Sequence, residues 1–134
     1  MIFVTGDTHR SDLLSLEVFC DNHPELTKDD YVIIAGDFGG VWAKDTLERD
    51  LKPFSDLPVT VLFVDGNHEK FDLIDSYPVE EWKGGKVHKI KPDSHLLPNF
   101  EDIVDFKHWF FGHFYIDAAL SDKYTALLHE VIEL

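Results

Sequence analysis

The stretch YVIIAGD, residues 31–37, is a short apolar, β-branched run that ends in Gly-Asp. A run of this length, bounded by a turn signal, is typical of a buried strand. Similar runs stand at Ile2–Val4 and Val59–Val64, and glycine with polar residues follows each of them. Helical patterns lie between the runs, at Ser11–Asn22 and at Ala43–Leu51, where Pro53 is expected to end the helix. This β-α-β-α-β order predicts an α/β fold with parallel strands and right-handed crossovers.

The pattern after Asn67 is weaker. It predicts a short helix over 71–77, a turn at Gly84-Gly85, a strand over 87–90 and a loop over 92–98. A helix over 99–106, a strand over 108–112 and a closing strand or hairpin arm over 124–134 complete the prediction. With 134 residues, we expect a single domain spanning 1–134.

Composition excludes several classes of protein. Apolar residues make up 44% and charged residues 28%, which is ordinary for a globular chain and wrong for a disordered one. No apolar run approaches the roughly 18 residues of a membrane span. The single cysteine, Cys20, excludes an internal disulfide framework and is expected to be a packing thiol. The sequence also starts without a secretory signal pattern, so we expect a cytoplasmic protein.

The charge balance is strongly acidic. Twelve Lys and Arg against 26 Asp and Glu give a formal net charge of −14. Such a surface repels nucleic acid and anionic membranes, whose partners carry basic patches. If the substrate is an anion, bound metal cations are the candidates for attracting it.

Polar residues follow each apolar strand of the predicted sheet. They are donors of the kinds that Mn²⁺, Fe, Zn²⁺ or Mg²⁺ accept. Because ligands of open α/β sheets bind at the carboxyl ends of the strands, we expect these side chains to converge there. The strand-end residues are Asp7, His9, Asp37, Asn67, His68 and His113.

The ordered series GDTH at 6–9, GD at 36–37, GNHE at 66–69 and GH at 112–113 resembles the calcineurin-like metallophosphoesterases. The resemblance covers the chain up to about residue 91 and again from about residue 105 to the end. It implies mixed sheets flanked by helices, around a dinuclear metal centre that hydrolyses phosphoesters. It also implies a role for each motif residue. Asp7 and His9 would ligate the first metal, Asp37 would bridge both, Asn67 and His113 would ligate the second, and His68 would contact the leaving group or a phosphoryl oxygen.

Physical chemistry is consistent with these roles. Two cations about 3.5–4 Å apart can clamp the attacking and leaving oxygens of a displacement, and a carboxylate such as Asp37 can hold them together. His68 can donate a proton near neutral pH. Glu69 either orients His68 or a ligand, or is a surface carboxylate.

The sequence departs from the family pattern in two places. The family motif Gly-His-x-His reads Gly112-His113-Phe114-Tyr115 here, so a phenol stands where the second histidine would ligate the first metal. The family histidine between the Gly-Asn-His motif and the last motif is also missing. His95, in the predicted loop, is its only loop candidate, whereas His88 and His108 fit strands. These departures suggest an internal deletion near residues 92–100 and an incomplete second sheet, whose uncovered apolar face favours a homodimer.

Three functions follow from this sequence. The leading hypothesis is a phosphatase or phosphodiesterase with two divalent metals and a phosphoester substrate. The alternative is a degenerate member of the family that binds metal or a partner with little or no catalysis. A nucleotide- or nucleic-acid-binding module is disfavoured by the charge and by the absence of a Gly-rich phosphate loop.

Overall fold

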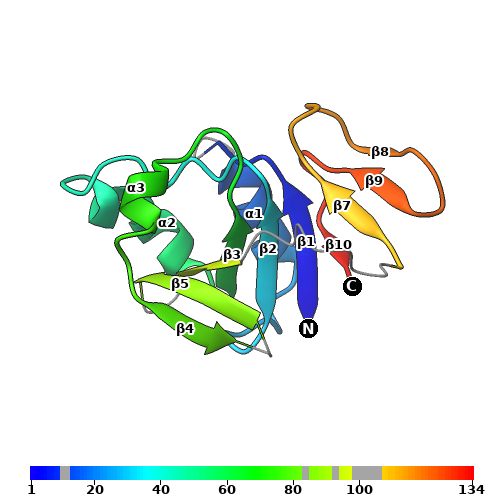
Figure 1. Ribbon diagram of the computed structural model, residues 1–134. Helices are drawn as coiled ribbons and strands as arrows, with labels where there is room; N and C mark the ends of the chain where they lie inside the picture. Colours follow the sequence, from blue (N-terminus) through cyan, green and yellow to red (C-terminus); the bar gives the residue numbers. More distant parts are fainter. Residues whose placement is uncertain (10–12, 83–84, 92–93, 98–106) are drawn as a thin grey trace.

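A seven-stranded mixed sheet forms the centre of the computed structural model, which describes residues 1–9, 13–82, 85–91, 94–97 and 107–134 (Figure 1). The strand order is β10-β1-β2-β3-β6-β5-β4. β1, β2, β3 and β6 run parallel, β10 is antiparallel to β1, and β5 is antiparallel to both of its neighbours. The bounds are β1 Ile2–Gly6, β2 Tyr31–Ala35, β3 Thr60–Val64, β4 Val79–Trp82, β5 Gly85–Lys91, β6 Ser94–Leu97 and β10 Ile132–Glu133. The three parallel strands predicted in the first half of the chain are therefore confirmed.

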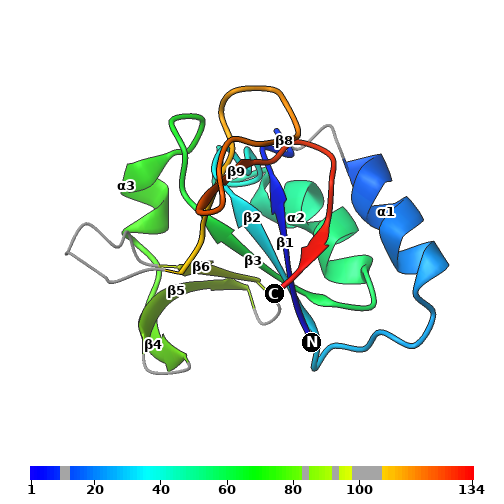
Figure 2. The same ribbon diagram turned by 90° about the vertical axis from the view of Figure 1, so that its right-hand side faces the viewer.

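The main core lies between this sheet and the helices α1, Leu13–Asn22, and α2, Leu47–Asp56. In Figure 2 both helices lie on one side of β1 and β2. Alternate residues of β2 and β3 face them, including Val32, Ile34 and Phe63, all of which are fully buried. This period-2 pattern follows from the pleat of the strands. Cys20 is buried in the same core, as expected of a packing thiol.

Helix α2 differs from the prediction, because it begins at Leu47 and continues through Pro53. Proline removes one backbone hydrogen bond from a helix. The apolar residues Leu47, Leu51 and Phe54 lie one turn apart and are buried in the core, so their packing carries the helix past the proline. The third helix, α3, is also shorter than predicted and spans Phe71–Ile74.

A second, three-stranded sheet packs on the other face of the large one. It contains β7 Trp109–Phe111, β8 Ala118–Ala119 and β9 Tyr124–Ala126, in the order β7-β9-β8. Figure 1 shows it beside β1 and β10. Val4 and Leu127 are buried between the two sheets, with Phe110 and Ile132 packed against them. The fold is thus α/β with two mixed sheets and helices on the large sheet, as the family resemblance implies.

Residues 94–97, predicted to be loop, form β6 instead. The strand pairs in parallel with β3 and antiparallel with β5, so it links the parallel half of the sheet to the β4–β5 hairpin. His95 therefore lies in a strand, in register with Leu62, and not in a loop. The predicted helix over 99–106 and the Gly84 part of the predicted turn lie outside the described residues.

The predicted closing strand over 124–134 is divided between the two sheets. β9 belongs to the small sheet and β10 pairs with β1, with a bend between them. The Asp117 carboxylate organises this bend, since it accepts hydrogen bonds from the backbone N–H groups of Leu128, His129 and Glu130. Burial raises the pKa of Asp117, but these bonds outweigh burial and leave the pKa below its ordinary value.

Replacing Asp117 with alanine is expected to lower the free energy of unfolding by about 1 kcal/mol, because hydrogen bonds to a charged group are strong but this carboxylate is exposed to solvent. Because the folded-state pKa is the lower one, the wild-type advantage is present above the unfolded pKa and disappears as the pH falls through the folded pKa. Urea unfolding of both proteins at pH 7 and at pH 3 measures this. An equal difference at both pH values would contradict it.

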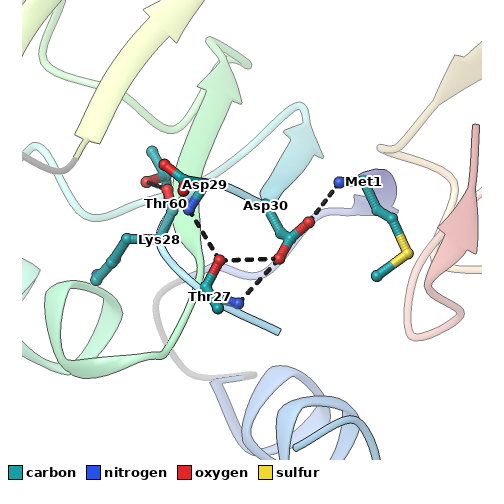
Figure 3. Close-up of polar contacts among 6 residues, drawn as sticks. All are labelled: Met1, Thr27, Lys28, Asp29, Asp30 and Thr60. Atoms are coloured by element: carbon teal, nitrogen blue, oxygen red, sulfur yellow. Dashed lines mark hydrogen bonds and ion pairs between the residues drawn. The ribbon is translucent and has the colours of Figure 1, made fainter. Parts of the chain in front are cut away.

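The amino-terminal edge of the parallel strands is held by polar contacts (Figure 3). The Asp30 carboxylate binds the amino group of Met1 and accepts hydrogen bonds from Thr27, one of them from the backbone N–H at 2.9 Å. The Thr60 hydroxyl donates to the Lys28 carbonyl at 2.7 Å. Each of these groups is paired, in contrast to the opposite edge of the sheet.

In the described part of the chain, no helix is long and apolar enough to cross a membrane.

Candidate metal centre

The loops after β1, β2, β3 and β7 are joined to one another at the carboxyl edge. The backbone N–H of His9 donates to the Asp37 carbonyl at 2.9 Å, and the N–H of His68 donates to Asp37 Oδ1 at 3.0 Å. The N–H of His113 donates to Asp7 Oδ2. These bonds bring four segments that are distant in the sequence to one place. The loops after β1, β2 and β3 meet because these parallel strands end at the same edge of the large sheet, and β7 of the small sheet brings His113 to them.

Asp7, His9, Asp37, His68 and His113 form one cluster, and Asp37 lies at its centre. It is 1% exposed, and its Oδ2 has no hydrogen-bond partner. The same oxygen lies 3.8 Å from His9 Nε2 and 3.9 Å from His113 Nδ1. The two imidazoles, from the loops after β1 and β7, thus point a nitrogen toward one carboxylate oxygen.

Asp7 is the second buried carboxylate of the cluster. It is also 1% exposed, and its Oδ1 has no hydrogen-bond partner. Burial raises its pKa, and the nearby charge of Asp37 raises it further. Because Asp7 is buried beside the charge of Asp37, added positive charge would be stabilising at this place.

The loops of this cluster also contain strained backbone conformations. Four residues other than glycine have a positive φ in the described ranges: His9 at 43°, Asp37 at 29°, His113 at 76° and Tyr115 at 53°. Such conformations cost free energy and persist where the surroundings enforce them, often at functional sites. Each of the four lies in a loop that contributes to the cluster.

The donor set fits a divalent cation. His9, Asp37 and His68 each offer a ligand atom, and these atoms lie within 4.8 Å of one another. Asp7 Oδ1, His9 Nε2 and Asp37 Oδ2 are buried without hydrogen-bond partners. A buried polar atom left unpaired costs about 1–3 kcal/mol, which a bound cation would offset.

The sequence-predicted residues are not equally placed. Asp7, His9, Asp37 and His113 are linked by the contacts above, and the His68 ring lies 5.1 Å from the His9 ring, edge to face. Asn67 lies in the loop after β3, next to His68, and its side chain is exposed. His108, predicted to be structural, contacts Thr125 Oγ1 at 2.9 Å. Of the described histidines, those in the cluster all come from strand-end motifs.

Glu69 has a structural task that the sequence left open. Its side chain is 5% exposed, so the surface alternative is wrong. Its Oε1 accepts a hydrogen bond from the Gly39 N–H at 2.6 Å, which ties the loop after β3 to the loop that carries Asp37. Burial raises the pKa of this carboxyl to about 7, against the Gly39 hydrogen bond and aided by the charge of Asp37.

The Glu69 pKa predicts a pH dependence of the metal-free protein. The folded-state pKa of about 7 exceeds the ordinary 4.5, so the folded state binds more protons between these values. The free energy of unfolding therefore falls as the pH rises through this window. The wild type should lose this stability and Glu69→Gln should not. The free energy of unfolding of Glu69→Gln minus that of the wild type should therefore rise between pH 5 and pH 8, on the order of 3 kcal/mol. Asp7 shifts in the same direction and remains in the variant.

Urea unfolding in EDTA at both pH values measures this gain. Glu17→Gln, an exposed position of α1, is the control and should show no such change. If the free energy of unfolding of Glu69→Gln differs from that of the wild type by the same amount at pH 5 and pH 8, other groups cause the pH dependence.

One contact of the site carries no signal in the sequence. The Tyr115 ring stacks on the His9 imidazole, with centroids 5.5 Å apart and planes 5° from parallel. The two residues are 106 positions apart, and only the packing of the small sheet on the large one brings them together.

Comparison with known proteins gives one family. The sequence model described as calcineurin-like phosphoesterase matches residues 1–124, which include all the motif residues named above. No curated protein and no solved structure matches the chain.

Proposed function

Since the chain belongs to the calcineurin-like phosphoesterase family, we propose that it hydrolyses phosphoesters at a dinuclear metal centre at the carboxyl edge of β1, β2 and β3. The observation that supports this most is the group of unpartnered buried atoms on Asp7, His9 and Asp37. A folded protein does not leave such atoms unpaired without a reason, and a bound cation supplies one.

The proposal gives each residue a task. Asp7, His9 and Asp37 would hold the first ion, and Asp37 with Asn67 and His113 would hold the second. Bound divalent ions would supply positive charge and Lewis acidity to a chain with a net charge of −14. The mixed carboxylate, amide and imidazole donors are of the kinds that Mn, Fe, Zn and Mg accept.

His68 is proposed as the proton donor to the leaving group. Its backbone N–H is fixed on Asp37 Oδ1, which holds the loop in place. Its side chain is exposed and packs edge-on against the His9 ring, so a substrate can reach it beside the metal ligands. An imidazole can act as a general acid and give a proton to a departing alkoxide.

One domain spanning 1–134 and a cytoplasmic location are part of the proposal. The location is supported by the single cysteine, Cys20, which is buried and free. Nucleic acid stays an unfavourable partner for this acidic chain.

We also expect the protein to form a homodimer. Leu62 is surrounded by Tyr31, Ile33 and Val64, which stay partly exposed on the face opposite the helices. An apolar cluster of this kind gains free energy from a partner surface. Analytical ultracentrifugation should give a mass of two chains, and a monodisperse monomer that melts cooperatively would contradict the expectation.

A degenerate family member is the second candidate, and Tyr115 favours it. Its phenol stands where the family motif has a histidine, and an imidazole is the usual ligand of transition metals. Such a protein would bind one ion or none and would act through binding rather than hydrolysis.

Hydrolysis of a generic aryl phosphate and of an aryl phosphodiester tests the proposed function. We expect Mn²⁺-loaded protein to hydrolyse at least one of them, EDTA to abolish the reaction, and His68→Asn to lower kcat by about 10²–10⁴-fold. His129→Asn, at an exposed position outside the cluster, is the matched control. Protein that binds Mn²⁺ and hydrolyses neither compound would favour the degenerate alternative.

A further inference from the structure

Tyr115 combines three unusual properties. It has a positive φ of 53°, its side chain is 59% exposed, and its ring lies parallel to the His9 imidazole at a centroid distance of 5.5 Å. A bulky residue with positive φ is an outlier that needs a compensating contact. The described ring contact of Tyr115 is the one with His9, so the two observations belong together.

The His9 ring contacts two aromatic rings, those of His68 and Tyr115. Its Nε2 is buried without a hydrogen-bond partner, 3.8 Å from Asp37 Oδ2. Tyr115 covers the face of the imidazole, and the His68 ring meets it edge-on at 5.1 Å. A histidine ligand needs its ring orientation fixed by its surroundings, and the parts around it that do so contribute strongly to metal affinity.

We propose that Tyr115 is a positioning residue whose stacked ring holds the His9 imidazole with Nε2 toward the Asp37 carboxylate. This inference rests on the proposed metal centre and extends it, because it gives the family-divergent position a role other than ligation. The role is assigned to the ring because the contact with His9 is a stack of one ring on the other. Tyr115 would therefore strengthen binding of the first ion by orienting its ligand His9.

Three variants separate the ring from the hydroxyl. Tyr115→Phe keeps the stacked ring and removes the hydroxyl, whereas Tyr115→Leu removes the ring. Tyr124→Leu, at an exposed tyrosine of β9, is the control. Calorimetric titration with Mn²⁺ should show wild-type affinity for Tyr115→Phe and Tyr124→Leu. Tyr115→Leu should bind Mn²⁺ about 2- to 10-fold more weakly, as expected for the loss of one aromatic pair.

A metal-independent measurement accompanies the titration. In the metal-free protein, the ring current of Tyr115 should shift the NMR signals of the His9 ring protons. Tyr115→Leu should remove that shift, and Tyr115→Phe should retain it.

Several results would overturn the inference. If Tyr115→Phe binds Mn²⁺ as weakly as Tyr115→Leu, the hydroxyl acts and the ring does not. If Tyr115→Leu keeps wild-type affinity, or leaves the His9 signals in place, Tyr115 positions nothing. Wild-type protein that binds no Mn²⁺ would instead contradict the proposed function, while the His9 signals would still report the stack.

Discussion

Asp37→Asn is expected to lower Mn²⁺ affinity by more than about 100-fold and to remove phosphoester hydrolysis. Loss of residues that merely support a ligand costs roughly 10–100-fold, and Asp37 is proposed as a ligand to both ions. We expect the substitution to preserve the fold, because the amide oxygen of asparagine can still accept the hydrogen bond from the His68 N–H. It replaces the unpartnered, buried Oδ2 with an amide nitrogen that cannot bind a cation.

The measurement is the rise in melting temperature when Mn²⁺ is added to metal-free protein. The wild type should be stabilised by Mn²⁺, and Asp37→Asn should not respond. Asp45→Asn, an exposed position in the segment before α2, is the matched control and should respond like the wild type. An Asp37→Asn protein that still gains the full stabilisation would remove Asp37 from the metal centre.

Substitution of Gly66 or Gly112 by alanine is expected to displace a carboxylate of the cluster, because each glycine backbone lies against one. A Cβ on Gly66 would lie 2.0 Å from Asp37 Oδ1 and 2.2 Å from the Asp37 nitrogen. A Cβ on Gly112 would lie 2.1 Å from Asp7 Oδ1 and 2.5 Å from the Ala35 carbonyl oxygen. Neither the carboxylate nor the backbone can stay in place, so we expect Mn²⁺ affinity to fall by at least about 10-fold. We also expect a loss of about 1–3 kcal/mol in stability.

Gly6→Ala provides the comparison for these two variants. Its Cβ would lie 1.8 Å from the Leu127 carbonyl oxygen, so it strains the packing of the two sheets rather than a carboxylate of the cluster. Measured at a temperature where all three proteins are folded, Gly6→Ala should lose stability and retain more Mn²⁺ affinity than the others. Equal affinity losses in all three would show that overall destabilisation, and not contact with Asp7 or Asp37, is the cause.

The strand ends were predictable because the apolar runs are short and each ends in glycine and polar residues. The positions of Asp7, Asp37 and His68 follow from that local pattern together with the geometry of parallel strands. Glu69 was visible in the GNHE motif, but its burial depends on the Gly39 loop and is not encoded locally.

Other features depend on contacts between distant parts of the chain. Pro53 ends a helix by local rules, and only the burial of Leu47, Leu51 and Phe54 explains why α2 continues. The four-residue strand β6 has no distinctive pattern and exists through its pairing with β3 and β5. The bond from His113 to Asp7 spans 106 positions and requires the small sheet to be in place. Long-range pairing of this kind leaves no mark in the neighbouring sequence.

A titration of metal-free wild-type protein with Mn²⁺, followed by measurement of bound metal per chain, tests the central claim most directly. The proposed centre predicts two equivalents per chain, one held by Asp7, His9 and Asp37 and the other by Asp37, Asn67 and His113. It also predicts that Asp37→Asn binds neither ion tightly. One equivalent or fewer in the wild type would contradict a dinuclear centre.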